Sequence, residues 1–230
     1  MKYLIPLVFA VLGAVAAPAS AQSPVVVELF TSQGCSSCPP ADKLMHELAK
    51  RDDVIALALH VDYWDYIGWK DEFADPANSD RQRGYAAEAG RRSVYTPQMI
   101  INGTTDIVGA RPMDLSKAIA DHSARTSPVA LTATRAGDKV RIVATSTQQN
   151  ADMLIHMLRY QPERTARITR GENAGHTLTY ANVTEDWKIL QEWDGVTELE
   201  LEAQAAGDIP VVVMVQDGRH GAILAAVQIR

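Results

Sequence analysis

The two cysteines of the chain are the residues whose types and spacing point most directly to chemistry. Cys35 and Cys38 enclose Ser36 and Ser37 in a Cys-x-x-Cys motif. This spacing places the second sulfur close enough to the first to resolve a mixed disulfide. The positive end of a helix that follows favours ionisation of the first cysteine, and the thiolate is the nucleophile in such chemistry. The motif therefore predicts a redox-active pair.

A strand and a helix must position this motif. Residues 25–30 are rich in β-branched and aromatic side chains, which is typical of a strand. A short polar loop at residues 31–34 precedes the motif, and the apolar spacing after it predicts a helix at about residues 41–50. Strand, loop, Cys-x-x-Cys and helix form the context that separates a redox pair from a chance pair of cysteines.

Length and composition narrow the possible functions. The chain has 230 residues, a formal net charge of −6 and only two cysteines. An acidic chain without a Lys/Arg cluster argues against a nucleic-acid partner. A small exported domain stapled by disulfides would need more cysteines, so the pair favours redox chemistry. An inert surface disulfide is the alternative, although two intervening residues are poor spacing for a loop-closing staple.

The first 21 residues resemble a secretory signal. Lys2 precedes an apolar core at residues 3–16, and Ala19-Ser20-Ala21 forms a small-residue cleavage site. The apolar core is shorter than the ~20 residues that span a bilayer, although an uncleaved anchor is the alternative. We therefore expect a periplasmic or secreted protein that meets the membrane only through its signal peptide before cleavage.

The pattern of elements changes near Ser127-Pro128. Before it, strands are predicted at residues 54–61, 98–101 and 105–108 and helices at residues 79–90 and 112–123. Such alternation favours a parallel sheet covered on both faces. After it, short strands recur at residues 130–135, 140–144, 153–160, 177–180, 187–192, 197–202, 211–216 and 222–229. We therefore expect a signal peptide (1–21), an α/β domain (22–126) and a sandwich-like β domain (127–230).

The chain resembles the thioredoxin superfamily and, more narrowly, a secreted bacterial family known as domain-of-unknown-function family 1223. The segments that carry the resemblance are residues 29–41 (LFTSQGCSSCPPA), 60–69 (HVDYWDYIGW), 81–85 (RQRGY), 96–103 (TPQMIING) and 170–175 (RGENAG). The resemblance implies an α/β thioredoxin-like domain followed by a β-sandwich-like domain. It implies no settled reaction. The resemblance also assigns no chemical role to the polar segment 170–175.

The resemblance also assigns roles to particular residues. Cys35 is the attacking sulfur, Cys38 resolves, and Thr96-Pro97 corresponds to the cis-proline that faces the disulfide. No histidine lies between the cysteines, so we expect a reduction potential nearer the reducing or isomerising relatives. Glu28 is an acid in an apolar strand and is a candidate proton shuttle beneath the cysteines. The alternative for Glu28 is an ion pair with a basic side chain.

Three further residues are candidate substrate contacts. Tyr63, Trp64 and Asp65 lie in an aromatic and acidic segment that follows the strand next to the motif. The alternative is that these aromatic side chains form a small satellite core.

The sequence leaves three functions open. The first is an exported thiol–disulfide oxidoreductase that acts on thiols or disulfides of another exported protein, without a cofactor and with an unidentified redox partner. The second is a copper(I) chaperone that uses the same cysteines, with His60 as a better placed third ligand than His46, which lies about two helical turns past Cys38. The third is a non-catalytic partner-binding module whose disulfide only rigidifies the site.

Overall fold

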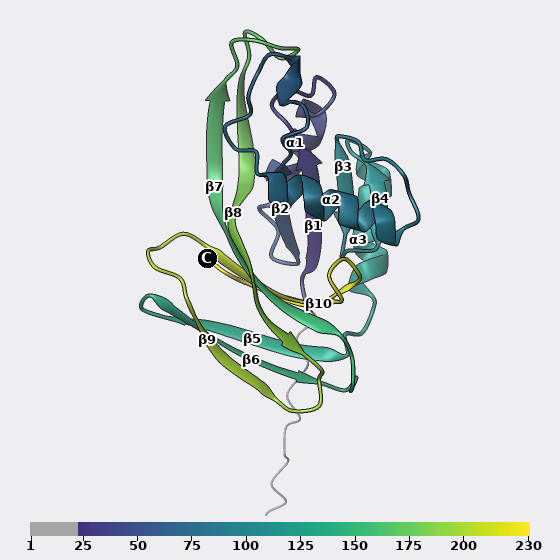
Figure 1. The fold of residues 1–230 in the computed structure, drawn as a ribbon, viewed down its shortest axis with the longest axis vertical. Helices are drawn as coiled ribbons and strands as arrows, with labels where there is room; N and C mark the ends of the chain where they lie inside the picture. The colour runs from purple at the N-terminus through teal and green to yellow at the C-terminus, as the bar shows by residue number, and fades with distance from the viewer. Residues whose placement is uncertain (1–22) are drawn as a thin grey trace, which may run out of the picture.

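The computed structural model describes residues 23–230 and shows a mixed α/β fold with one large sheet and few helices (Figure 1). The expected signal peptide and its cleavage site lie outside the described residues. The large sheet contains β1 (Val25–Thr31), β2 (Val54–His60), β3 (Gln98–Ile101), β4 (Thr105–Val108), β7 (Met153–Arg167), β8 (Thr177–Trp193), β10 (Val211–Asp217) and β11 (Ile223–Ile229). Its strands run in the order β11-β10-β7-β8-β2-β1-β3-β4.

A smaller sheet and three α-helices complete the fold of the described residues. The sheet has the order β5-β6-β9, with β5 (Val129–Ala136), β6 (Lys139–Ser146) and β9 (Leu199–Gln204). The helices are α1 (Pro39–Leu48), α2 (Pro76–Glu88) and α3 (Pro112–Ser123), and a short 3-10 helix, η1, spans Asp65–Ile67. Among residues 23–230, no helix has the length and apolar character that crossing a membrane requires.

The centre of the large sheet is buried on both faces, which explains the continuous apolar runs of β1 and β2. The two strands are parallel, and β3 pairs antiparallel with the other edge of β1. Side chains alternate along β1: Leu29 packs in a cluster with Met45 of α1, whereas Phe30 packs in a cluster with Tyr85 of α2. Helices α1 and α2 therefore cover opposite faces of β1.

The large sheet continues through the second half of the chain. The strand β8 lies parallel to β2, with Ala58 opposite Val183. The strands expected at residues 177–180 and 187–192 are one strand, because the polar residues between them bond to β2. Asn182 and Thr184 donate side-chain hydrogen bonds to backbone carbonyls of β2 at 2.8 and 3.1 Å. Strands from both sides of the boundary expected at residue 127 thus share one sheet.

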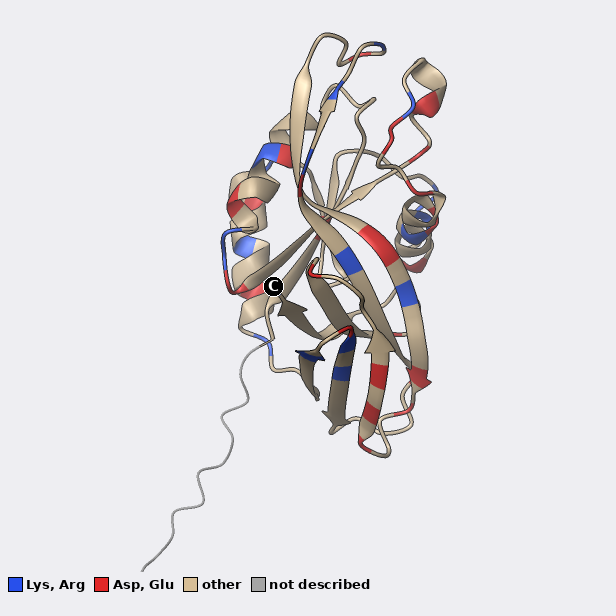
Figure 2. Cartoon of the chain, turned by 90° about the vertical axis from the view of Figure 1, so that its left-hand side faces the viewer, with Lys and Arg blue, Asp and Glu red and all other residues tan. Residues whose placement is uncertain are grey.

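The smaller sheet packs against β7, β10 and β11 of the large sheet, at the bottom of the view in Figure 1. Val140 and Ile142 of β6 share an apolar cluster with Ile155 of β7 and Val213 of β10. Outside this cluster, Lys and Arg alternate with Glu on neighbouring strands, as in the Arg141–Glu200 pair (Figure 2). Charges of both signs are intermixed on the elements that Figure 2 shows.

Candidate functional site

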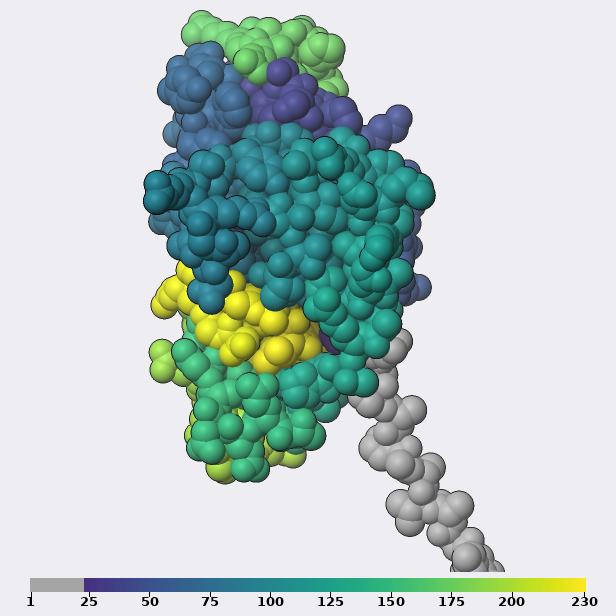
Figure 3. Space-filling model, turned by 90° about the vertical axis from the view of Figure 1, so that its right-hand side faces the viewer, coloured from purple at the N-terminus to yellow at the C-terminus, as the bar shows by residue number. Residues whose placement is uncertain are grey.

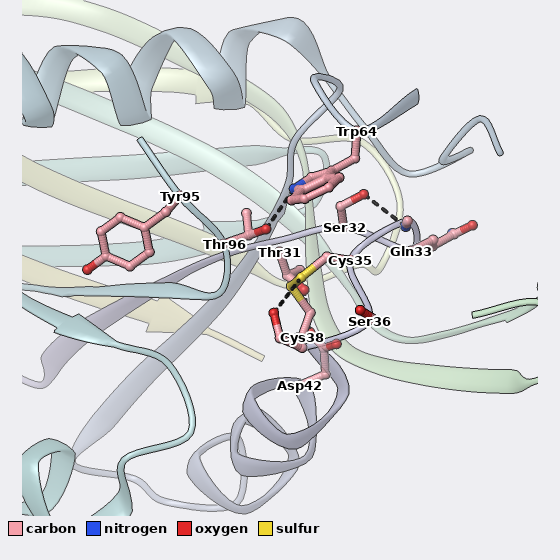
Figure 4. The surroundings of a disulfide bond; sticks show 12 residues. Thr31, Ser32, Gln33, Cys35, Ser36, Cys38, Asp42, Trp64, Tyr95 and Thr96 are labelled. Carbon is pink, nitrogen blue, oxygen red and sulfur yellow. Dashed lines mark hydrogen bonds between the residues drawn. A yellow bond between two sulfur atoms is a disulfide. The ribbon is translucent and has the colours of Figure 1, made fainter. Parts of the chain in front are cut away.

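The two cysteines form a disulfide at the start of a helix. Cys35 and Cys38 are bonded through their sulfur atoms, with 5.4 Å between their Cα atoms. The cysteine loop, residues 32–38, leaves the end of β1, and α1 begins immediately after Cys38. The structure thus has strand, loop, cysteine pair and helix in the order that the sequence predicts (Figure 4).

The helix start offers the cysteines few backbone donors. Pro39 and Pro40 occupy the first two helical positions and carry no N–H group. The next two amides both donate to the carbonyl oxygen of Cys38, at 2.8 and 3.1 Å. The helix dipole therefore acts on Cys35 without free amides from its first turn, and its sulfur is contacted instead by the Ser37 hydroxyl, whose oxygen lies 3.4 Å from Sγ.

The disulfide lies just beneath the surface. Cys35 is 1% exposed and Cys38 is fully buried, while Ser36 and Ser37 between them are exposed. Exchange requires an attacking sulfur to reach one of the two sulfur atoms. The proposed chemistry supposes an accessible Cys35, so this burial departs from the expectation. Access to the pair therefore depends on the segments that cover it.

Thr96-Pro97 lies in the same region as the disulfide. The peptide bond between the two residues is cis. The indole nitrogen of Trp64 donates to the Thr96 hydroxyl at 2.7 Å, and Figure 4 shows both side chains beside the cysteines. A Cβ atom placed on Gly109 would lie 2.6 Å from Pro97 Cβ and 3.0 Å from Ala41 Cβ, so the proline lies close to the first turn of α1.

Asp42 is a buried acid that the sequence interpretation did not single out. It lies one helical turn after Cys38, on the side of β1 that α1 covers. The Thr31 hydroxyl donates to Oδ1 at 2.8 Å, and Oδ2 has no hydrogen-bond partner among the described residues. Burial raises the pKa of Asp42 to about 7, although nearby His60 and the Thr31 hydrogen bond oppose the shift. The spacing of four residues from Cys38 is the signal that could have identified it.

A second buried acid anchors the cysteine loop. His60 Nδ1 donates to Asp71 Oδ2 at 2.7 Å, and both side chains are fully buried. The same oxygen accepts the backbone amide of Gln33 at 2.8 Å. The ring of Tyr180 from β8 packs edge-on against the His60 ring, with centroids 4.6 Å apart. This polar cluster therefore ties the loop to β2 and β8.

The structure corrects the expectation for Glu28. Its Oε1 accepts from Arg81 Nε at 2.7 Å, and its Oε2 accepts from the Tyr85 hydroxyl at 2.6 Å. Alternation along β1 directs Glu28 toward α2, whereas Thr31 points to the face that carries α1 and the cysteines. Glu28 therefore has the ion-paired role that the sequence left open, and Asp42 is the buried acid next to the cysteines.

The aromatic segment contributes one predicted residue to the site. Trp64 reaches Thr96, as described above. Tyr63 donates to Gln82 of α2 at 3.0 Å, and Asp65 accepts a backbone amide at 3.0 Å, so both support the local structure. Tyr66, which the sequence interpretation did not select, is 81% exposed and stacks on Trp64 with centroids 6.3 Å apart.

The expected copper ligand is engaged elsewhere. His60 uses Nδ1 to bond Asp71, and its ring is fully buried. Within residues 23–230, no group of three or more His, Cys, Asp or Glu side chains is arranged to hold a metal ion.

The fold and the site define a mixed α/β protein with a disulfide-bonded Cys-x-x-Cys pair at the start of a helix. The chain belongs to the family described as protein of unknown function (DUF1223), whose model matches residues 26–216. The narrower resemblance inferred from the sequence is thereby confirmed, while membership of the thioredoxin superfamily stays a prediction.

The solved structures that resemble the chain include the following two. Protein AGR_C_4864 from Agrobacterium tumefaciens is 31% identical, with a TM-score of 0.78 over 92% of this chain and 96% of that chain. HBP35 of Porphyromonas gingivalis is 15% identical, with a TM-score of 0.60 over 90% of this chain and 75% of that chain. The second likeness concerns the fold alone. No curated protein matches the chain.

Proposed function

We propose that this protein carries out thiol–disulfide exchange with another exported protein through Cys35 and Cys38. The observation that carries the proposal is the pairing of these two cysteines at the start of α1, beside a buried carboxyl group. The parallel β1 and β2, the antiparallel β3 and β4, and helices on both faces support a thioredoxin-like reading of this part of the chain.

The exchange has two steps when the protein reduces a client disulfide. The Cys35 thiolate bonds to one client sulfur, and the client S–S bond breaks with its electron pair on the second client sulfur. The Cys38 sulfur then attacks Cys35, which restores the Cys35–Cys38 disulfide and releases the first client sulfur. Two electrons pass to the client, and the same steps in reverse oxidise a client dithiol.

Asp42 is suited to move the proton of Cys38. When Cys38 attacks, its thiol proton must leave, and when Cys38 is displaced from the disulfide, its sulfur must gain one. A buried carboxyl group with a pKa of about 7 accepts or releases a proton near neutral pH. Its position one turn after Cys38 supports this role.

The surface beside Thr96 is suited to hold the client. Pro97 has no N–H group, so an extended segment can lie beside the disulfide and pair with the neighbouring backbone. Trp64 and the exposed Tyr66 stack next to Thr96 and offer an apolar wall to such a segment. These contacts select an extended peptide that carries a cysteine.

The proposal is tested by insulin reduction and by refolding of scrambled ribonuclease. We expect the wild-type protein to accelerate at least one of these reactions, and the Cys35→Ser variant to be inactive in both. A Ser116→Ala variant, altered at an exposed position of α3, serves as the control and should retain activity. Wild-type rates equal to those of Cys35→Ser would contradict exchange and favour the binding module.

A further inference from the structure

The connection between β7 and β8 reaches the cysteine loop from the second half of the chain. We define the β7–β8 tip as residues 168–176. Its base is closed by two backbone hydrogen bonds of 2.9 Å between Ile168 and the residues Gly175 and His176. Figure 3 shows the tip, in light green, lying directly against the purple atoms of the N-terminal segment. The tip contains the polar segment 170–175 to which the sequence assigned no chemistry.

Asn173 binds the loop that carries the attacking sulfur. Its Nδ2 donates to the backbone oxygen of Gln33 at 2.9 Å and to that of Cys35 at 3.0 Å. The residue is only 6% exposed, so these bonds lie away from water. One buried amide group thus satisfies two carbonyl groups of the cysteine loop, one of them on Cys35 itself.

Glu172 adds a second contact on the exposed side. Its Oε2 accepts from the Ser36 hydroxyl at 2.6 Å and from the Ser36 backbone amide at 3.3 Å. These hydrogen bonds lower the pKa of Glu172, so the contact favours the ionised carboxylate. The tip therefore holds Ser36, one of the two residues between the cysteines, as well as the backbone of Cys35.

The aromatic segment, residues 62–76, also contacts the cysteine loop. The indole of Trp69 donates to Gln33 Oε1 at 2.7 Å. At Gly171, whose φ is +78°, an added Cβ atom would lie 3.2 Å from Trp69 Cβ. The tip and the aromatic segment thus meet over the cysteine loop, and Cys35 is 1% exposed beneath them.

We propose that the β7–β8 tip is a gate that determines which thiols reach Cys35, with Asn173 and Glu172 as its specificity-determining residues. The gate rests on the exchange chemistry proposed above. Opening it exposes the carbonyl oxygens of Gln33 and Cys35, which then need new donors. The backbone N–H groups of an extended peptide segment can replace the Asn173 amide at these oxygens, whereas dithiothreitol carries no N–H group. The gate therefore favours a peptide client over free small thiols.

The gated step is the first attack on the disulfide. An incoming thiolate bonds to Cys35 Sγ, and the bond between the two protein sulfurs breaks. The electron pair leaves on Cys38 Sγ, which takes a proton from the Asp42 carboxyl group. A second thiol of the reductant then displaces Cys35 and forms the reductant's own disulfide, so the protein gains two electrons.

The test measures the rate at which dithiothreitol and reduced glutathione reduce the disulfide in three folded variants. We expect Asn173→Ala to be reduced about tenfold faster than wild type, since it loses two hydrogen bonds of ordinary strength. Asn173→Asp should be faster still, because a carboxylate faces two carbonyl oxygens. Glu172→Gln should be accelerated about threefold, and the bulkier glutathione should gain more than dithiothreitol.

Two controls separate a gate from general loss of stability. Glu163→Gln makes the same chemical change at an exposed position of β7 and should leave both rates unchanged. Low concentrations of urea should change the variant rates little, because a local opening exposes little surface. Unchanged rates in all three tip variants, or acceleration that follows global unfolding in urea, would overturn the gate.

The gate and the exchange function can fail separately. Faster reduction of the tip variants without any insulin reduction by the wild type would leave the gate and overturn the function. Insulin reduction by the wild type, with tip variants reduced at the wild-type rate, would overturn the gate alone.

Discussion

Asp42 follows Cys38 by one helical turn, and its backbone amide donates to the Cys38 carbonyl oxygen at 3.1 Å. The buried carboxyl group is held from one side by Thr31, and its pKa is raised to about 7 chiefly by burial. His60 of β2, Asp71 of the loop beyond it and His46 of α1 are the other charged or titratable groups that influence this carboxyl group. This relationship ties the acid–base chemistry of the site to the residue that must gain or lose a proton.

The Asp42→Asn variant should lose the pH dependence of disulfide reduction. In the wild type, the displaced Cys38 sulfur takes a proton from Asp42, which is protonated below a pH of about 7. The reduction rate per dithiothreitol thiolate should therefore fall about tenfold between pH ~6 and pH ~8. The variant should show a flat and slower profile, measured by stopped-flow mixing across that range.

Glu28→Gln is the matched control for this prediction. It makes the equivalent carboxyl-to-amide change at the other buried acid of the first strand–helix unit, where Arg81 lies 2.7 Å away. We expect the wild-type pH profile together with a loss of stability of about 3 kcal/mol, because Arg81 is left as a buried charge. If instead Glu28→Gln flattened the profile and Asp42→Asn kept it, the acid would have been assigned to the wrong residue.

Asp42 and His156 should make opposite contributions to stability as the pH changes. The raised pKa of Asp42 means that the folded state binds its proton more tightly than the unfolded state, whose value is near 3.8. This group therefore costs stability as the pH rises from about 4 to about 7. Burial and the charge of Arg81 lower the pKa of His156 from 6.5 to about 3, so stability is lost as the pH falls below 6.5.

Urea unfolding of the disulfide form, at pH ~5 and pH ~7, measures both effects. From pH ~5 to pH ~7, the free energy of unfolding of Asp42→Asn should rise by about 2 kcal/mol relative to that of the wild type. His156→Gln, which keeps an acceptor for the Trp187 indole at this site, should gain about 2 kcal/mol relative to wild type as the pH falls. Variants whose stability runs parallel to the wild type would show that neither group is perturbed.

Pro40→Ala should make the disulfide easier to reduce. The substitution returns an N–H group to the first turn of α1, where it can stabilise the Cys35 thiolate in the reduced protein. We expect the reduction potential to rise by roughly 30 mV, from a wild-type value below about −180 mV. Equilibration with glutathione buffers measures both, and Ala41→Gly, which leaves the number of amides unchanged, is the control. A wild-type potential near −120 mV would contradict this account.

The sequence predicted local features of the site because they depend on short segments. The strand of residues 25–30, the loop and Cys38 before a helix follow from neighbouring residues and correspond to β1, the cysteine loop and α1. The cysteine pairing and the position of Thr96 near it also agree with the segments that carried the family resemblance.

The remaining features depend on contacts between distant segments, which no local pattern contains. The sequence predicts a buried acid at Glu28 for both a proton shuttle and an ion pair. Only the face of β1 on which Glu28 lies shows that it pairs with Arg81. Asn173 donates a hydrogen bond to the backbone oxygen of Cys35, which is 138 residues away in the sequence. The polar residues at about 181–186 suggested a break between two strands. They lie within the single strand β8, where the Asn182 side chain donates to a backbone carbonyl of β2.

The most direct test of the central claim is to map where a mixed disulfide forms. Reduced Cys38→Ala is mixed with an excess of a short peptide disulfide, and the adduct is located by peptide mass spectrometry; Cys35→Ala is treated in parallel. We expect a stable adduct on Cys35 in the first variant, little adduct on Cys38 in the second, and prompt release of the peptide by the wild type. Adducts that form equally on both cysteines, or preferentially on Cys38, would contradict it.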